Sequence, residues 1–219
     1  MSGGGDAGRE VRDLLVLAAV RHAASEGWTA AAIRAGAGEL GIDAVDAERI
    51  LRGGPRTLFR ALNDWADERM AAAVGGASRS RLSERVETAM LARFDALLPW
   101  RESVARGVAF AAMPQNTGLG FACHCRTVDR MWRACGDRSH DFSFYTKRAI
   151  LAGILAATTL VWLEDRSADG AATRAFLRRR LANVARIGRL RGRAERLADG
   201  LTGLARRPSV FHRGRRPAL

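Results

Sequence analysis

The chain has 219 residues, and 47% of them are hydrophobic, which is enough for one domain with a sizeable buried core and excludes disorder as its main state. The formal net charge is +13. Residues 178–219 hold thirteen arginines against Glu195 and Asp199, so most of this charge lies near the C-terminus and points to an anionic partner there.

Helical periodicity dominates the sequence and strand-forming residues are sparse, so we predict an all-α protein. After a disordered start over residues 1–8, we expect a first helix that ends at Gly27. Thr29 then caps a second helix that stops at Gly41. A third helix covers roughly residues 45–51, and Pro55 opens a fourth that runs to about residue 74. Residues 9–75 therefore have the spacing of a helix-turn-helix unit.

The segment expected to be the recognition helix has the wrong charge for DNA. Residues 41–50 carry Asp43, Asp46 and Glu48 against Arg49 alone. Carboxylates repel the phosphate backbone, and sequence readout relies on cationic and amide side chains. We therefore expect no specific binding of nucleic acid.

The second part of the chain, residues 76–188, predicts further helices after a linker at residues 75–80. They are expected over about 82–97, up to Pro114, around 128–132, over 142–163 and after Gly170. The apolar run 149–163 would extend only about 22 Å as a helix, short of the roughly 30 Å of a hydrocarbon core. We interpret it as a buried helix rather than a membrane span.

Four residues that often bind metals, Cys123, His124, Cys125 and Cys135, lie close in sequence. A Cys-x-Cys pair on a helix directs its thiols apart, and no second ligand pair completes a tetrahedral set. We expect free thiols in a reducing compartment, with no metal and no cofactor. No motif pairs a nucleophile with a base, so we do not predict an enzyme.

The start of the sequence suggests a cytosolic protein. Residues 1–5 lack the basic and apolar regions of a secretory signal, and acidic residues at positions 6, 10 and 13 argue against a mitochondrial presequence.

A block of aromatic and charged residues opens the expected helix at 142. Residues 136–142 read Gly-Asp-Arg-Ser-His-Asp-Phe, and residues 145–148 read Tyr-Thr-Lys-Arg. Phe144, Tyr145 and Arg148 share a helix face of the kind found at protein interfaces. The block, with residues 114–116, 128–135 and 176–180, resembles the ubiquinone (coenzyme Q) biosynthesis accessory proteins of the Coq-nine family.

This resemblance implies a TetR-like fold without DNA binding, an apolar pocket for isoprenoid or quinone lipids, and a C-terminal amphipathic helix. It also implies docking onto the di-iron demethoxyubiquinone hydroxylase. The partner surface of the family carries over to Met131, Phe144, Tyr145 and Arg148.

Large apolar side chains in the second part are compatible with a lipid cavity, and equally with a filled core. The candidate lipid-binding residues are Phe110, Met113, Phe121, Trp132, Phe142, Leu155, Trp162 and Phe176.

Residues 189–207 form an apolar stripe flanked by arginines, which predicts a helix lying in an anionic membrane surface. The alternative is that the stripe packs on the protein itself or on a second subunit. Residues 208–219 are a basic tail. The candidate membrane-binding residues are Leu190, Arg193, Leu197, Leu201 and Leu204.

Together these features predict a non-enzymatic accessory protein, expected as a homodimer, that presents polyprenyl quinone intermediates to a ring hydroxylase. It would act on the inner face of a bacterial membrane, or on the matrix side in a eukaryote. The alternative is a ligand-sensing repressor of the TetR type.

Overall fold

The computed structural model describes residues 3–75, 80–136 and 143–186, without the side chains of residues 3–6 and 143–145. Every regular element in these residues is a helix, which confirms the predicted all-α class. The chain divides into two units, Met1–Arg178 and Arg179–Leu219. Of the second unit, only the helical residues 179–186 are described.

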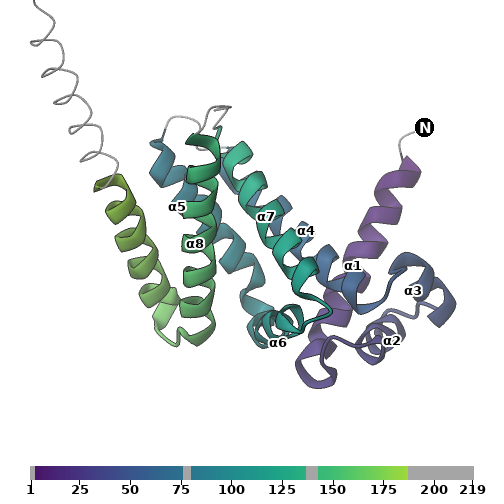
Figure 1. Cartoon of the computed structure of the whole chain (residues 1–219). Helices are drawn as coiled ribbons and strands as arrows, with labels where there is room; N and C mark the ends of the chain where they lie inside the picture. The colour runs from purple at the N-terminus through teal and green to yellow at the C-terminus, as the bar shows by residue number, and fades with distance from the viewer. Residues whose placement is uncertain (1–2, 76–79, 137–142, 187–219) are drawn as a thin grey trace, which may run out of the picture. The chain divides into compact units, whose positions relative to one another are not determined.

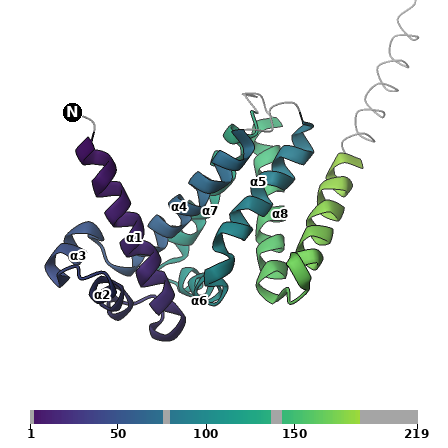
Figure 2. The ribbon, with the colours of Figure 1, turned by 180° about the vertical axis from the view of Figure 1, so that it is seen from behind.

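The first four helices follow the predicted turns closely. They are α1 (Gly3–Glu26), α2 (Ala30–Glu39), α3 (Ala44–Ile50) and α4 (Pro55–Gly75). Helices α1, α2 and α3 lie at one end of the first unit, and α4 runs from there alongside α7 (Figures 1 and 2). Gly27 and Gly41 end α1 and the turn after α2 with positive φ, which costs glycine little. Helix α1 begins at Gly3, earlier than predicted, so residues 3–8, which we expected to be disordered, are helical.

The remaining helices run through the rest of the first unit. They are α5 (Leu82–Leu97), the short η1 (Leu98–Trp100), α6 (Arg101–Ala112), α7 (Thr117–Ala134) and α8 (Ser143–Glu164). A second short element, η2 (Ala168–Gly170), precedes the helical residues 171–186. The expected domain boundary near residue 75 does not divide the structure, because α4 packs against α5 and α7 across it.

Helix α8 corrects the prediction of a fully buried helix. Its segment Thr146–Glu164 is long and apolar enough to cross a membrane by length and composition alone, and only 22% of the apolar window is buried. Leu151, Leu155 and Trp162 face the core, whereas Ile150 and Leu160 are exposed. The helix is only partly buried because its described neighbours in the first unit cover only part of its circumference.

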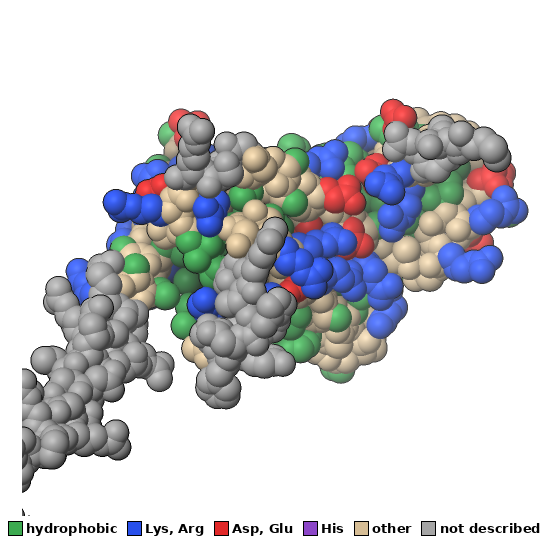
Figure 3. Space-filling model, turned by 90° about the horizontal axis from the view of Figure 1, so that it is seen from above, with side chains coloured by type: hydrophobic (Ala, Val, Ile, Leu, Met, Phe, Trp, Pro, Cys, Tyr) green, Lys and Arg blue, Asp and Glu red, His purple; other side chains and the backbone are tan. Residues whose placement is uncertain are grey.

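Charged side chains of both signs lie next to one another over the face of the molecule drawn in Figure 3. The pairs include Arg130 with Asp64 at 3.0 Å and Arg148 with Asp129 at 2.8 Å. This mixing agrees with the small net charge of residues 1–177.

Candidate ligand-binding cavity

A mostly apolar cavity of about 350 Å³ opens among α4, α5, α6, α7 and α8. This volume is at the lower end of the range for small-molecule sites, so the cavity suits a ring or a short stretch of chain. Its walls come from helices far apart in the sequence. The lining residues are Trp28, Phe59, Leu62, Asn63, Arg93, Phe94, Leu97, Val104, Gly107, Val108, Ala111, Ala112, Thr117, Gly120, Phe121, Cys123, His124, Thr127, Leu155, Thr159 and Trp162.

Aromatic rings form two sides of the cavity. Phe94 and Trp162 stack with their centroids 5.3 Å apart and an interplanar angle of 21°. On the other side, Trp28 meets Phe59 edge-on at 5.4 Å. Phe110 stacks on Trp28 from behind, with centroids 6.1 Å apart, although it does not itself line the cavity. Such pairs favour fixed ring positions, so these walls are preformed.

A glycine on α6 allows Trp28 to reach the cavity wall. A Cβ atom at Gly107 would lie 3.0 Å from the Trp28 ring, so a larger residue would displace the indole. One turn earlier, the carbonyl of Ser103 accepts a hydrogen bond of 2.9 Å from Trp28 Nε1. The indole is therefore fixed at both its apolar face and its polar atom.

The mouth of the cavity lies where α6 and α7 meet. Val108 is 38% exposed and Phe121 is 72% exposed, and both line the cavity. Arg56 on α4 fixes this connection, because its Nη1 donates to the Gln115 carbonyl and to Asn116 Oδ1, each at 2.7 Å. An exposed phenyl ring at the rim of an apolar cavity suits contact with lipid or with another protein.

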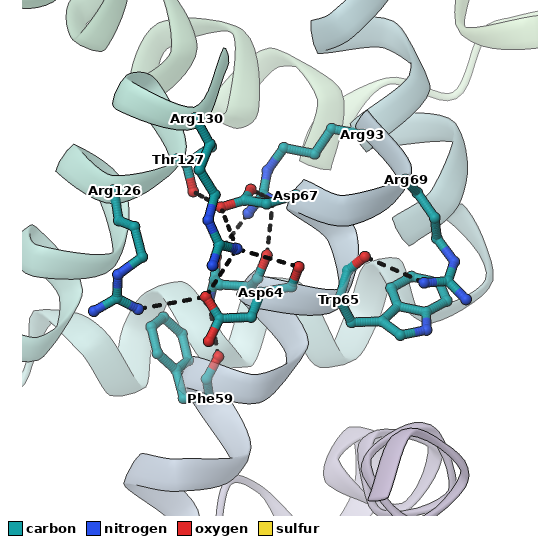
Figure 4. A network of polar contacts seen from close by, with 10 residues as sticks. Phe59, Asp64, Trp65, Asp67, Arg69, Arg93, Arg126, Thr127 and Arg130 are labelled. Carbon is teal, nitrogen blue, oxygen red and sulfur yellow. Dashed lines mark hydrogen bonds and ion pairs between the residues drawn. The ribbon is translucent and has the colours of Figure 1, made fainter. Parts of the chain in front are cut away.

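Part of the cavity lining is polar, and Figure 4 shows the network of polar contacts to which Arg93 and Thr127 belong. Arg93 on α5 donates from Nη2 to Asn63 Oδ1 at 2.7 Å and from Nη1 to the buried carboxylate of Asp67. Thr127 on α7 donates to the other Asp67 oxygen at 3.1 Å. This cluster joins α4, α5 and α7. Breaking such a buried pair by removing one partner typically costs about 3–5 kcal/mol, so it holds the inner wall in place.

Burial raises the pKa of Asp67, and Arg93 and the Thr127 hydroxyl oppose that rise. Asp64 continues the network toward the surface, where it pairs with Arg130 at 3.0 Å and with Arg126 at 3.4 Å (Figure 4). Arg130 also lies 3.7 Å from Asp67, so the network holds three arginines against two aspartates.

His124 also lines the cavity, one turn before Thr127 on α7. Its Nε2 lies 3.0 Å from the carbonyl oxygen of Ala152 on α8. A carbonyl oxygen can only accept, so Nε2 is the donor, and Nδ1 of the neutral ring is an acceptor. The ring thus fixes the distance between α7 and α8 and retains one atom for a further hydrogen bond.

The structure brings together some of the predicted lipid-binding residues. Phe121, Leu155 and Trp162 line the cavity, and Phe110 supports its wall. Trp132 is buried away from it, and Met113 is exposed at the end of α6, so neither is among the lining residues. Phe176 is not among them either, and Phe142 lies outside the described residues.

The predicted partner surface needs one correction. Met131 is fully buried because it faces the core side of α7, so its placement on a partner-facing surface is wrong. Arg148 pairs with Asp129 through Nη2 at 2.8 Å and Nε at 3.2 Å. The side chains of Phe144 and Tyr145 lie outside those the structure describes, as do the predicted membrane-binding residues at 190, 193, 197, 201 and 204.

The cysteines are free, and two of them are buried. Burial raises the pKa of the Cys123 thiol and raises that of Cys135 to about 11, so both stay protonated at neutral pH. Within the described residues, no three potential metal ligands among His, Cys, Asp and Glu gather into a site.

Trp28, Phe59, Asn63 and Arg93 are among the lining residues that the sequence analysis missed. They belong to the part assigned to the helix-turn-helix unit or to α5, and a pattern along one helix does not reveal which residues of other helices it meets. An all-α protein of this kind, with a helix-turn-helix-like end followed by a bundle of longer helices, has a TetR-like fold. The fold comparison agrees. The crystal structure of a TetR transcriptional regulator from Nitrosomonas europaea superposes with a TM-score of 0.67 and 24% identity, covering 80% of this chain and 98% of that one.

Sequence comparison finds similarity to one family. Residues 118–188 match the family model described as COQ9. The mitochondrial ubiquinone biosynthesis protein COQ9 of Rattus norvegicus is 29% identical over 208 residues, which are 90% of this chain and 67% of that protein. The Homo sapiens protein of the same name is 28% identical over 208 residues, 90% of this chain and 65% of that protein.

Residues 118–188 therefore match the family to which the motif at residues 136–148 has its resemblance. This segment contains most of α7 and all of α8, which form one side of the cavity. The chain spans about two thirds of the length of the curated relatives that it matches. The similarity supports a role in ubiquinone biosynthesis.

Proposed function

We propose that this protein is a non-enzymatic, lipid-binding accessory protein of ubiquinone biosynthesis that presents polyprenyl quinone intermediates to a ring hydroxylase. The observation that carries the proposal is the largely apolar cavity with an exposed apolar mouth, built in part from the segment that matches COQ9. A ring buried in a bilayer is out of reach of a water-soluble active site. A cavity that accepts part of the lipid would take the ring out of the bilayer and bring it to such an active site.

The membrane part of the proposal rests on two features. Phe121 and Val108 form an apolar rim through which a lipid could enter the cavity. Residues 189–207 combine leucines at helical spacing with arginines, each of which adds about 1 kcal/mol near an anionic leaflet. We place the protein at the surface of an anionic membrane, in contact with a hydroxylase through the region of residues 144–148.

A homodimer is also part of the proposal. The side of α8 that its neighbours leave uncovered is apolar, with Ile150 at 41% and Leu160 at 60% exposed, and it carries Ala149, Gly153 and Ala156. Small residues allow close approach of a second helix. A second copy of the chain would bury this face.

The alternative function, a ligand-sensing repressor, is favoured only by the TetR-like fold. The acidic residues of α3 argue against a repressor that binds DNA through this helix. In α3, Asp43 caps the helix, Asp46 is paired with Arg49, and Glu48 is exposed. A recognition helix of this kind would bring carboxylates to the phosphate backbone.

Quinone analysis of cells tests the proposal. Val104→Trp places an indole in the cavity, whereas Ala105→Trp adds the same group at an exposed position outside the lining. In a host strain that lacks the gene, we expect low ubiquinone and an accumulated unhydroxylated precursor. Wild type and Ala105→Trp should restore ubiquinone, and Val104→Trp should not. Normal ubiquinone without the gene, or full rescue by a folded Val104→Trp protein, would contradict the proposal.

A further inference from the structure

A second pocket, of about 390 Å³, lies between the end of α5, the start of α6 and the segment that follows α8. Phe94 and Trp162 line both this pocket and the apolar cavity, so their stacked rings stand between the two. We call the second one the arginine pocket, because charged side chains make up much of its lining. They are Asp95, Arg101, Asp165, Arg166, Asp169 and Arg174.

Arg101, the first residue of α6, is fixed against the wall of the arginine pocket. Its Nη1 donates to the backbone carbonyl of Asp165, and its guanidinium carbon lies 5.2 Å from the centre of the Trp162 ring. Its Nε is buried and has no acceptor in the described part of the chain. Among the described residues, no carboxylate forms an ion pair with Arg101. A fixed, partly buried cation without a counter-ion favours an anionic ligand.

Two further arginines reach the same pocket from other segments. Arg166, in the turn after α8, is exposed and forms no ion pair within the described ranges. Arg174 is paired with Asp95 at 3.3 Å, and its Nε donates to the carbonyl of Asp169 at 2.9 Å. A guanidinium group can bind phosphate through two parallel N–H bonds. Arg101 and Arg166 are therefore the two cations of the pocket that suit a phosphate.

The aspartates of the pocket differ in what they can still bind. Asp95 already has its arginine. Both oxygens of Asp165 accept hydrogen bonds from Ser167 and Thr173. Asp169 is exposed, and its carboxylate pairs with no cation of the described residues. An anion alone would be repelled by this carboxylate, whereas an ammonium group on the same ligand would be attracted to it.

The rest of the lining is apolar. Leu91 and Leu98 belong to it beside the two aromatic rings, and Leu98 is exposed. Inorganic phosphate has no group that could cover these side chains. A ligand with a carbon skeleton next to its phosphate would bury them, and burial of apolar surface favours binding.

We infer that the arginine pocket binds a phosphoethanolamine group, with its phosphate at Arg101 and Arg166, its ammonium toward Asp169, and its carbon skeleton against Leu91 and Leu98. This group occurs both in free small molecules and in the head group of a phospholipid. The inference does not rest on the proposed function, because it concerns a different pocket from the apolar cavity.

Isothermal titration calorimetry of the full-length protein tests the inference with three probes. They are phosphoethanolamine, inorganic phosphate, and dihexanoylphosphatidylethanolamine below its micelle concentration. We expect phosphoethanolamine to bind at least fivefold more tightly than phosphate. Tighter binding of the short-chain lipid than of phosphoethanolamine would assign the group to a phospholipid, and equal or weaker binding would assign it to a free small molecule.

Two variants at exposed positions separate the roles of the charges. Arg166→Ala should weaken phosphoethanolamine binding at least fivefold. Asp169→Asn should remove the preference over phosphate, and asparagine tolerates the positive φ of 53° at this position. Arg60→Ala is the matched control, because it removes an exposed arginine of α4 that does not line the pocket, and it should leave binding unchanged.

Val104→Trp distinguishes the two pockets, because Val104 lines only the apolar cavity, and phosphoethanolamine binding should survive this change. Equal affinity for phosphoethanolamine and phosphate would overturn the inference. So would the same loss in Arg60→Ala as in Arg166→Ala, which would indicate unspecific attraction to arginines. A loss of binding in Val104→Trp but not in Arg166→Ala would place the ligand in the apolar cavity and overturn it as well.

Discussion

Asp165 carries one of the densest sets of hydrogen bonds on a single side chain in the described structure. Its Oδ1 accepts from the backbone N–H of Ser167 at 2.9 Å and from the Ser167 hydroxyl at 2.5 Å. Its Oδ2 accepts from the backbone N–H of Thr173 at 2.8 Å and from the Thr173 hydroxyl at 2.6 Å. Burial alone would raise the pKa of Asp165, but these bonds favour the carboxylate and hold the pKa below its ordinary value.

This lowered pKa predicts a pH dependence of stability. Because the unfolded carboxyl group has the higher pKa, the unfolded state binds the proton first as the pH falls. The contribution of Asp165 is therefore fully present well above pH 3.8, the ordinary value, and is lost as the pH falls below it. Thermal unfolding followed by circular dichroism from pH 7 to pH 3 measures this loss.

In the same experiment, Asp165→Asn should melt several degrees lower than wild type at pH 7, and the gap should narrow as the pH falls. The variant keeps one acceptor oxygen and no charge. A gap that stays constant from pH 7 to pH 3 would show that the charge of Asp165 contributes nothing.

At the scale of elements, replacing two glycines of α2 by alanine should change the stability of the protein in opposite directions. A Cβ atom at Gly36 would lie 2.4 Å from the backbone nitrogen of Ala19 on α1, so α2 can pack this closely only with glycine there. A Cβ atom at Gly38 would meet nothing within 4 Å. Gly36→Ala should therefore destabilise the protein by about 1–3 kcal/mol through overpacking. Gly38→Ala should stabilise it by about 0.5–1 kcal/mol, because alanine is the better helix former.

Thermal unfolding of the two variants checks this pair. For a chain of this length, 1 kcal/mol corresponds to a shift of roughly 2–4 °C in the melting temperature. Similar melting temperatures for the two variants would mean that α1 and α2 are not packed as described.

The proposed membrane helix allows a prediction by deletion. Removing residues 189–219 takes away nine of the thirteen arginines of the basic C-terminal stretch and leaves the described helices intact. The truncated protein should stay folded by circular dichroism, and it should no longer float with anionic liposomes. Flotation that persists, or outright unfolding, would assign residues 189–207 to the alternative role of packing on the protein itself or on a second subunit.

For the molecule as a whole, local signals predicted the helices well, and the cavity only in part. Gly27, Thr29, Gly41 and Pro55 mark helix ends through backbone conformation and capping, which act within a few residues. The cavity depends on contacts between distant helices. No pattern within one helix predicts that Trp28 reaches Gly107, 79 positions later.

Two aromatic residues of α7 show what helical periodicity alone cannot predict. Phe121 and Trp132 are eleven residues apart, so they lie on nearly the same face of the helix, about 16 Å apart along its axis. Periodicity treats them alike and predicted both as lipid-binding. In the structure, Phe121 lies at the mouth of the cavity and Trp132 is buried at the other end of α7. The difference comes from which helices cover each end.

Mass spectrometry of lipids that co-purify with the full-length protein shows whether the cavity holds a prenylated ring. We expect wild type and Ala105→Trp to retain a polyprenyl phenol or quinone through purification, and Val104→Trp, with its cavity filled, to lose it. Recovery of the same lipids at the same level with Val104→Trp, or their absence from the wild-type protein, would contradict this expectation.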